Sequence, residues 1–312
     1  MYIATNETAP QRGRILEYIP QNIRRRMFNI NLDDAREIRI STGKPVSIYF
    51  SDGCYYISAR GNLSRIPSTA VRATRTDIEE AMELAAKSSV YSVGDEIKNG
   101  FITIGGGHRI GITGTAVTDK GKISFLKDIS AMNYRLAREV IGASDKVIDK
   151  ITDGNTIKST LIISPPCAGK TTMLRDIARS LSYKGTRVSI VDERREIAAM
   201  YEGKSGFDLG FSTDVLEGVG KAEGMLMMLR SMSPDVIITD EIGKMEDADA
   251  IEKIINSGVK IITTVHGTDR KQLLCRRDLR EICRYFDLMI TLSKRNGAGT
   301  VEEIYEAKSD MK

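Results

Sequence analysis

The stretch "IISPPCAGKTT", residues 162–172, decides which fold to expect for this chain. It begins as an apolar strand, turns through two prolines and ends in Gly-Lys-Thr. In the pattern G-x-x-x-x-G-K-[ST], backbone N–H groups late in the loop and at the start of the next helix hold phosphate oxygens. Ser164 stands where this pattern has its first glycine. The alternative interpretation is therefore a chance Gly-Lys-Thr in a strand–helix turn.

The surrounding sequence favours a nucleotide site. An apolar run precedes the loop, and the helical segment that follows has one apolar face, as a phosphate loop requires. Lys170 is placed to reach the β- and γ-phosphates of ATP, and Thr171 to ligate Mg²⁺. We expect the nucleotide to contact Ser164, Pro165, Pro166, Cys167, Ala168, Gly169, Lys170, Thr171 and Thr172.

A second motif, "DVIITDE" at residues 235–241, points to the same site. Asp240 at the end of an apolar strand suits the water shell of Mg²⁺, and Glu241 suits orienting the attacking water. Open α/β sheets bind ligands at the carboxyl ends of their strands, so the two motifs are expected to converge. An isolated Asp-Glu pair usually marks only the start of an exposed loop. Its position after an apolar strand, downstream of Gly-Lys-Thr, argues against that interpretation here.

Two further apolar runs end in polar residues. "SIVDERREI" places Asp192, Glu193 and Glu196 after one strand, and "IITTVHG" places His266 after another. A histidine in that position is often only structural. Because it joins three other polar strand ends, we expect His266 to contact the γ-phosphate or the attacking water.

The pattern after residue 150 predicts the fold class. "STLIIS", "RVSIVDE", "DVIITDE", "KIITTVH" and "DLMITLS" are continuous apolar runs, typical of parallel strands that are buried on both faces. Helical patterns separate them, which predicts an α/β domain with a mainly parallel, doubly wound sheet over residues 151–312. The closing "GTVEEIYEAK" is expected to add a hairpin strand.

The sequence pattern of residues 1–150 predicts a smaller, mixed α+β domain. "EIRI", "PVSIYF" and "CYYIS" indicate short strands, and "GFITIGGGHRIGITGTAV" a hairpin. A helix is predicted between them, with Thr76 as N-cap and Glu79 closing a capping box. The polar stretch "DKVIDKITDGNTIKS" is the expected link between the domains, with the boundary near residue 150.

Composition limits the classes of partner. The chain has 312 residues, 41% hydrophobic and 28% charged, with a net charge of +4, so charge gives no strong case for nucleic acid. Its four cysteines and two histidines form no disulfide or zinc pattern. The first 14 residues lack the apolar core of a signal peptide, and no segment is expected to span a bilayer.

The ordered set "SPPCAGKTT", "VDERREI", "LRSMSPDVIITDE" and "TTVHGTD" resembles the secretion ATPase superfamily of RecA-like P-loop motors. The four pieces are similar to its Walker A motif, Asp box, Walker B motif and His box. Further segments, including "MNYRLAREV" and "TDVLEGVGKAEGMLMM", resemble a sporulation branch of endospore-forming bacteria. The resemblance covers residues 90–270.

This resemblance implies catalytic roles for Lys170, Glu193, Glu196, Glu241 and His266. It also implies that the N-terminal domain supplies an arginine to the nucleotide, either Arg135 or Arg138, with Arg109 a weaker candidate; ordinary surface ion pairs are the equal alternative. These arginines lie within "HRIGITGTAV" and "MNYRLAREV". The superfamily commonly has Gly-Glu-Ile-Arg where this chain has Asp-Glu-Ile-Gly, which leaves open which carboxylate orients water. We favour Glu241.

The resemblance further implies a Mg²⁺-dependent ATPase that assembles as a hexameric ring. It would be cytoplasmic and peripheral to a membrane channel complex, on the mother-cell side of a channel to the forespore. Three alternatives remain: a RecA-like motor that binds nucleic acid, a small-molecule kinase, and a nucleotide-gated scaffold with little turnover. The chain has no Trp and shows no lid segment, which disfavours the first two.

Overall fold

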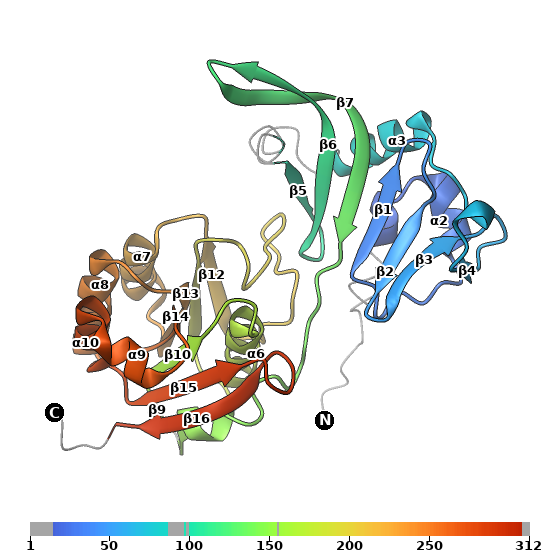
Figure 1. Ribbon diagram of the computed structural model, residues 1–312. Coiled ribbons are helices and arrows are strands. Elements are labelled where there is room, and N and C mark those ends of the chain that lie inside the picture. Colours follow the sequence, from blue (N-terminus) through green and yellow to red (C-terminus); the bar gives the residue numbers. More distant parts are fainter. Residues whose placement is uncertain (1–14, 87–96, 98–99, 155, 308–312) are drawn as a thin grey trace. The chain divides into compact units, whose positions relative to one another are not determined.

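The computed structural model describes residues 15–86, 97, 100–154 and 156–307, so the N-terminal segment assessed for a signal peptide lies outside it. The chain divides into two compact units (Figure 1). The first comprises Met1–Arg138 and Met200–Gly206, and the second Glu139–Ala199 and Phe207–Lys312. The chain therefore passes between the units three times, first after Arg138 and again on either side of the short segment Met200–Gly206.

The first unit is a mainly antiparallel sheet with helices, as the sequence predicts. Its seven strands are arranged in the order β4-β3-β2-β1-β7-β6-β5. They are β1 (Glu37–Ser41), β2 (Ser47–Phe50), β3 (Gly53–Ile57), β4 (Leu63–Ser64), β5 (Phe101–Ile104), β6 (His108–Asp119) and β7 (Lys122–Arg135). The helices are η1 (Leu16–Tyr18), α2 (Gln21–Met27), η2 (Pro67–Thr69) and α3 (Arg75–Ala86).

Helix α3 shows that one local prediction is wrong. The helix begins at Arg75, and Thr74, not Thr76, forms the capping box. The Thr74 hydroxyl accepts from the Asp77 amide at 3.2 Å, while the Asp77 carboxylate accepts from the amide and hydroxyl of Thr74, each at 2.7 Å. Thr-x-x-Asp satisfies both ends of the box as well as the expected Thr-x-x-Glu does, two residues earlier.

The second unit contains a seven-stranded sheet in the order β12-β11-β13-β14-β10-β15-β16, parallel except for its last pair. Its strands are β10 (Thr160–Ser164), β11 (Val188–Asp192), β12 (Thr213–Glu217), β13 (Val236–Glu241), β14 (Lys260–His266), β15 (Leu288–Ser293) and β16 (Thr300–Glu306). The helices are α5 (Ile148–Ile151), α6 (Lys170–Tyr183), α7 (Lys221–Met232), α8 (Met245–Asn256), α9 (Arg270–Cys275) and α10 (Arg277–Cys283). The predicted α/β class and the terminal hairpin are confirmed.

The polar stretch that was expected to link the domains belongs to this second unit. It forms α5 and a two-stranded hairpin, β8 (Thr152–Asp153) with β9 (Thr156–Ile157), and the side chain of Ile151 is fully buried. Apolar residues spaced through the polar stretch explain why it folds. None of the helices in the described part of the chain has the length and apolar character that crossing a bilayer requires.

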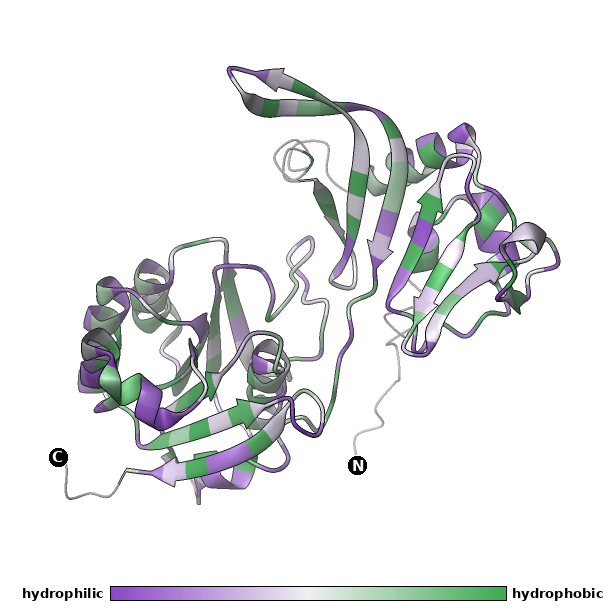
Figure 2. Cartoon of the chain, in the orientation of Figure 1, coloured by the Kyte–Doolittle hydropathy of each residue, from purple (hydrophilic) through white to green (hydrophobic). Residues whose placement is uncertain are grey.

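The sheet brings four strand ends together. Strands β11, β13, β14 and β10 are neighbours, and their central residues, such as Ile162, Ile238 and Ile262, are fully buried. Hydrophobic residues accordingly run through these strands (Figure 2). Because all four are parallel, their carboxyl ends share one edge of the sheet. The register pairs Ser164 at the end of β10 with His266 at the end of β14.

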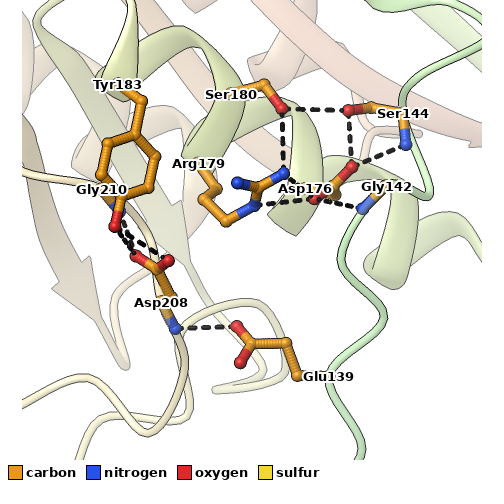
Figure 3. Close-up of polar contacts among 9 residues, drawn as sticks. All are labelled: Glu139, Gly142, Ser144, Asp176, Arg179, Ser180, Tyr183, Asp208 and Gly210. Atoms are coloured by element: carbon orange, nitrogen blue, oxygen red, sulfur yellow. Dashed lines mark hydrogen bonds and ion pairs between the residues drawn. The ribbon is translucent and has the colours of Figure 1, made fainter. Parts of the chain in front are cut away.

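Helix α6 holds the chain segments that lead to and from the first unit. The buried Asp176 carboxylate accepts from the Gly142 amide at 3.2 Å and from the amide and hydroxyl of Ser144 at 2.7 and 2.6 Å (Figure 3). Burial alone would raise the pKa of Asp176, but these bonds and Arg179 lower it below its ordinary value. Residues 139–144 are thereby fixed to the helix.

Two more residues of α6 hold the other crossings. Arg175 donates to the backbone carbonyls of Glu196 and Ile197, each at 2.7 Å, and burial lowers its pKa to about 10. The hydroxyl of Tyr183 donates to Asp208 at 2.9 Å, directly after the chain re-enters the second unit (Figure 3). All three crossings are therefore attached to one helix.

Candidate functional site

The loop between β10 and α6 connects a buried strand to the start of a helix, as the predicted phosphate loop requires. Cys167 and Gly169 have positive φ values, 57° and 89°, whereas Ser164 does not. Only the late part of the loop therefore needs the left-handed conformation. Ser164 is fully buried, and its hydroxyl donates to the carbonyl of Pro165 at 3.0 Å. A serine fits in the first position because nothing there demands glycine.

The end of the loop is closely packed and leaves helix donors open. A Cβ on Gly169 would lie 3.0 Å from the Gly299 amide, which donates to the Ala168 carbonyl at 2.9 Å. Gly169 is the N-cap of α6, and no side chain caps the helix. The first N–H groups of an α-helix have no intrahelical acceptor, and they attract anions. This cradle fits a phosphate group.

Lys170 and Glu241 bring the two predicted motifs together. Lys170 Nζ lies 3.3 Å from Glu241 Oε2, so the first residue of α6 meets the last residue of β13. The register between β13 and β14 shifts between Ile238 and Glu241. A bulge of this kind re-aims side chains at the end of a strand. The expected convergence of the Gly-Lys-Thr and Asp-Glu motifs is therefore present in the geometry.

Asp240 is buried and paired with a lysine that the sequence analysis did not select. Lys221 Nζ lies 3.1 Å from Asp240 Oδ1 and also forms an ion pair with Glu193. Burial raises the pKa of Asp240 above its ordinary value, while the Lys221 hydrogen bond lowers that of Glu193. Burial would lower the pKa of Lys221, but its two carboxylate partners together raise it. The one available signal was a lysine directly after "GVG", at the start of a predicted helix.

The acidic residues at and after the end of β11 lie in different environments. Asp192 is fully buried, and its carboxylate accepts from the amides of Glu196, Ile197 and Ala198, each at 2.9 Å. Glu193 faces Lys221, whereas the side chain of Glu196 is exposed. No described contact brings Glu196 to the other carboxylates, so its catalytic role stays a prediction.

The remaining predicted residues lie around this edge of the sheet. His266 is exposed at the end of β14, and Gly267 donates its amide to the Ser164 carbonyl at 3.3 Å. Thr171 and Thr172 are half-buried in the first turn of α6, and Pro166 and Cys167 are exposed in the loop. These positions do not test the expected contacts with the nucleotide, which stay predictions.

The candidate arginines lie in the first unit. Arg138 pairs with Asp34 at 2.9 Å on the surface, and Arg135 is an exposed residue of β7. The Arg109 guanidinium lies 5.3 Å from the centre of the Phe101 ring. Of the three, Arg138 makes a surface ion pair of the kind that the alternative interpretation expects. A role for any of the three at the nucleotide stays a prediction.

The available oxygen donors fit Mg²⁺ only together with a bound phosphate. Among the described residues, no group of three or more His, Cys, Asp or Glu side chains forms a metal centre. Mg²⁺ in proteins usually takes one or two protein oxygens and completes its shell with phosphate and water. Thr171 and Asp240 match that requirement. A cavity of about 860 Å³ adjoins the acids, lined in part by Glu193, Lys221 and Glu241.

Comparisons with known proteins agree with this architecture. The structure resembles the Legionella pneumophila ATPase DotB, with a TM-score of 0.53 and 17% identity over 86% of this chain and 75% of that one. It also resembles the pilus retraction motor PilT, solved with bound ADP, with a TM-score of 0.59 and 14% identity over 95% and 84%. At these identities the likeness shows a shared fold.

Sequence relatives identify the family. Stage III sporulation protein AA of Bacillus subtilis (strain 168) is 36% identical over 310 residues, which cover 96% of each chain. The model of the family described as "Sporulation stage III, protein AA" matches residues 9–311. The expected resemblance is confirmed: this chain belongs to the sporulation stage III protein AA family.

Proposed function

We propose that this protein hydrolyses ATP with Mg²⁺ at the edge of the second sheet. The observation that carries the proposal is the meeting of Lys170 and Glu241, 3.3 Å apart, beside an uncapped helix N-terminus. A lysine for the β- and γ-phosphates and a carboxylate for the attacking water are the two side chains that this chemistry needs at one place. The fold shared with DotB and PilT supports the same activity.

Each group has a defined task in this proposal. The open N–H donors from Ala168 to Thr172 bind the phosphate oxygens, and Lys170 leaves Glu241 to compensate the γ-phosphate charge. Glu241, once released, orients the attacking water. Thr171 and Asp240 hold Mg²⁺, which supplies further charge compensation for the phosphates when bound. His266 contacts the γ-phosphate or the water.

The wider role follows from the relatives. Because the chain belongs to a sporulation family and shares the fold of a pilus motor, we propose that ATP turnover energises a mother cell–forespore channel. In this proposal the protein is a cytoplasmic, peripheral component on the mother-cell side and forms a hexameric ring. An arginine from the first unit, Arg135 or Arg138, would complete each site only when the ring closes.

Phosphate release from ATP, measured with and without Mg²⁺ and with no acceptor added, tests the activity. Lys170→Ala is expected to lose nucleotide binding and turnover. Glu241→Gln is expected to bind fluorescent ATP normally while turning over at least about 100-fold more slowly. Glu252→Gln, which changes an exposed glutamate of α8 outside the cavity that adjoins the acids, is the matched control and should match the parent. Full turnover in both site variants would refute the assignment.

A nucleotide-gated scaffold is the second candidate, and one observation favours it. Glu193, Asp240 and Glu241 are all paired with lysines, so none of these three acids is free to act until its pairing changes. Tight ATP binding by the parent, with phosphate release no faster than that of Glu241→Gln, would support the scaffold. A rate increase on adding single-stranded DNA would instead support a nucleic-acid motor.

A further inference from the structure

Lys221 occupies a position that is unfavourable for a lysine on two counts. Its side chain is only 8% exposed, and lysines are rarely buried unless paired. It is also the first residue of α7, where the helix dipole disfavours a positive charge. Its two carboxylate partners, Glu193 and Asp240, offset these costs. Buried ion pairs with shifted pKa values cluster at functional sites, which favours a role for Lys221 beyond packing.

The ammonium of Lys221 lies against the carboxylate that the proposed Mg²⁺ site would use. Lys221 Nζ is 3.1 Å from Asp240 Oδ1, within the reach of a metal-bound water. A monovalent and a divalent cation that share one carboxylate oxygen repel each other strongly in a partly buried site. While its ammonium stays on Oδ1, Lys221 therefore disfavours Mg²⁺ at the Asp240 carboxylate.

The helix that carries Lys221 is held in place, so the side chain is what can move. A Cβ on Gly224, one turn into α7, would lie 2.6 Å from the side chain of Val191 in β11 and 2.9 Å from that of Val219. This close packing fixes the first turn of α7 against the sheet. Glu193 remains available as a partner, so Lys221 can release Asp240 without losing its charge compensation.

We propose that Lys221 and Mg²⁺ compete for Asp240, so that Lys221 is a positioning residue that keeps the site closed until Mg²⁺–nucleotide arrives. This inference rests on the proposed nucleotide site. Before binding, the lysine holds Asp240 and Glu193 in place. On binding, its ammonium moves to Glu193 alone, and Asp240 turns to the metal's water shell. The lysine thereby sets the Mg²⁺ concentration at which the nucleotide is held.

A Mg²⁺ titration at fixed ADP tests the competition, with fluorescent-nucleotide binding and Tm as readouts. Lys221→Met removes the charge and keeps the length of the side chain. Its Tm without Mg²⁺ should fall, because two carboxylates lose their partner. Its half-saturating Mg²⁺ concentration should nevertheless fall at least about fivefold, and Mg²⁺–ADP should raise its Tm by more than it does for the parent. If Lys221 were only structural, Lys221→Met would lower the Tm without Mg²⁺ and would change neither the Mg²⁺ midpoint nor the Tm shift caused by Mg²⁺–ADP.

Controls separate the possible failures. Lys221→Arg keeps the charge and should need about as much Mg²⁺ as the parent, and Lys184→Met changes a half-exposed lysine that pairs only distantly with Asp149. If Lys221→Met does not fold, Lys221→Gln carries the same comparison. An unchanged or higher Mg²⁺ midpoint in the uncharged variant overturns the competition. A parent that binds no nucleotide with Mg²⁺ overturns the proposed function and this inference with it.

Discussion

Asp192 is the last residue of β11 and Asp240 the last but one of the neighbouring parallel strand β13, yet the two carboxylates are satisfied in opposite ways. Asp192 accepts three backbone amides that its own turn supplies. Asp240 has the flexible ammonium of Lys221 as its partner. Backbone amides stay in place after folding, whereas a lysine side chain can move. Asp192 therefore stabilises the turn, whereas Asp240 can change partners, as the proposed Mg²⁺ site requires.

The largest expected effect comes from Asp192→Ala. Three N–H groups, two of them in buried hydrogen bonds, would lose their acceptor, which should lower the free energy of unfolding by about 3 kcal/mol. Urea denaturation followed by circular dichroism measures this. Asp214→Ala, an exposed acid of β12, should change stability by less than about 0.5 kcal/mol. Equal stabilities of the two variants would mean that the amide-bound acid is not structural.

Asp176→Asn adds a third buried acid to the comparison. Because this carboxylate is also held by amides, of Gly142 and Ser144, it should behave like Asp192. Asparagine keeps one acceptor but loses the ion pair with Arg179, so we expect a loss of about 2 kcal/mol. The exposed Asp149→Asn, measured in the same way, should stay within about 0.5 kcal/mol of the parent. If Asp176→Asn lost less free energy of unfolding than Asp240→Asn, the grouping of Asp176 with Asp192 would be wrong.

Asp240→Asn should have a smaller effect on stability, within about 1 kcal/mol, because Lys221 keeps Glu193 as a partner. Its effect on ligand binding should be larger: Mg²⁺-dependent binding of nucleotide should weaken at least about tenfold. Equilibrium denaturation and fluorescent-nucleotide titration give the two numbers. A stability loss as large as that of Asp192→Ala, with nucleotide binding intact, would reverse the roles assigned to the two acids.

The smallest effect is a difference in pH dependence. The lowered pKa of Asp176 stabilises the folded state above the ordinary Asp value, about 3.9, and that stabilisation is lost as pH falls. The raised pKa of Asp240 acts oppositely: the folded state holds this proton more tightly, so stability falls as pH rises through that range. Denaturation between about pH 5 and pH 3 should therefore show a shallower acid decline in Asp176→Asn and a steeper one in Asp240→Asn. Parallel curves would contradict both assignments.

Much of the second unit could be predicted from sequence because its strands are buried on both faces. Continuous apolar runs such as Leu161–Ile163 have no other good place in a soluble protein than a covered parallel sheet. Strand β12 was not predicted because "TDVLE" contains two acids and none of its residues is fully buried. The capping box of α3 was misplaced because Thr74 and Thr76 both fit the pattern, and only the fold decides between them.

The parts of the candidate site that could be predicted are those whose residues lie close together in the sequence. The loop up to Lys170 and the Asp240–Glu241 pair are local motifs, and the strand-end rule was enough to bring them together. Lys221 was missed because its importance comes from burial between two strand ends, which no local pattern records. The separation of Asp192 from Glu193 was missed for the same reason: adjacent acids in a sequence do not reveal which one turns inward.

The attachment of the three crossings to α6 has a mechanical consequence. Asp176 lies about 9 Å along the helix axis from Lys170, and α-helices resist bending over such lengths. If ATP binds as proposed, a displacement of the N-terminal end of α6 would therefore act, through Arg175, Asp176 and Tyr183, on all three segments that connect the two units.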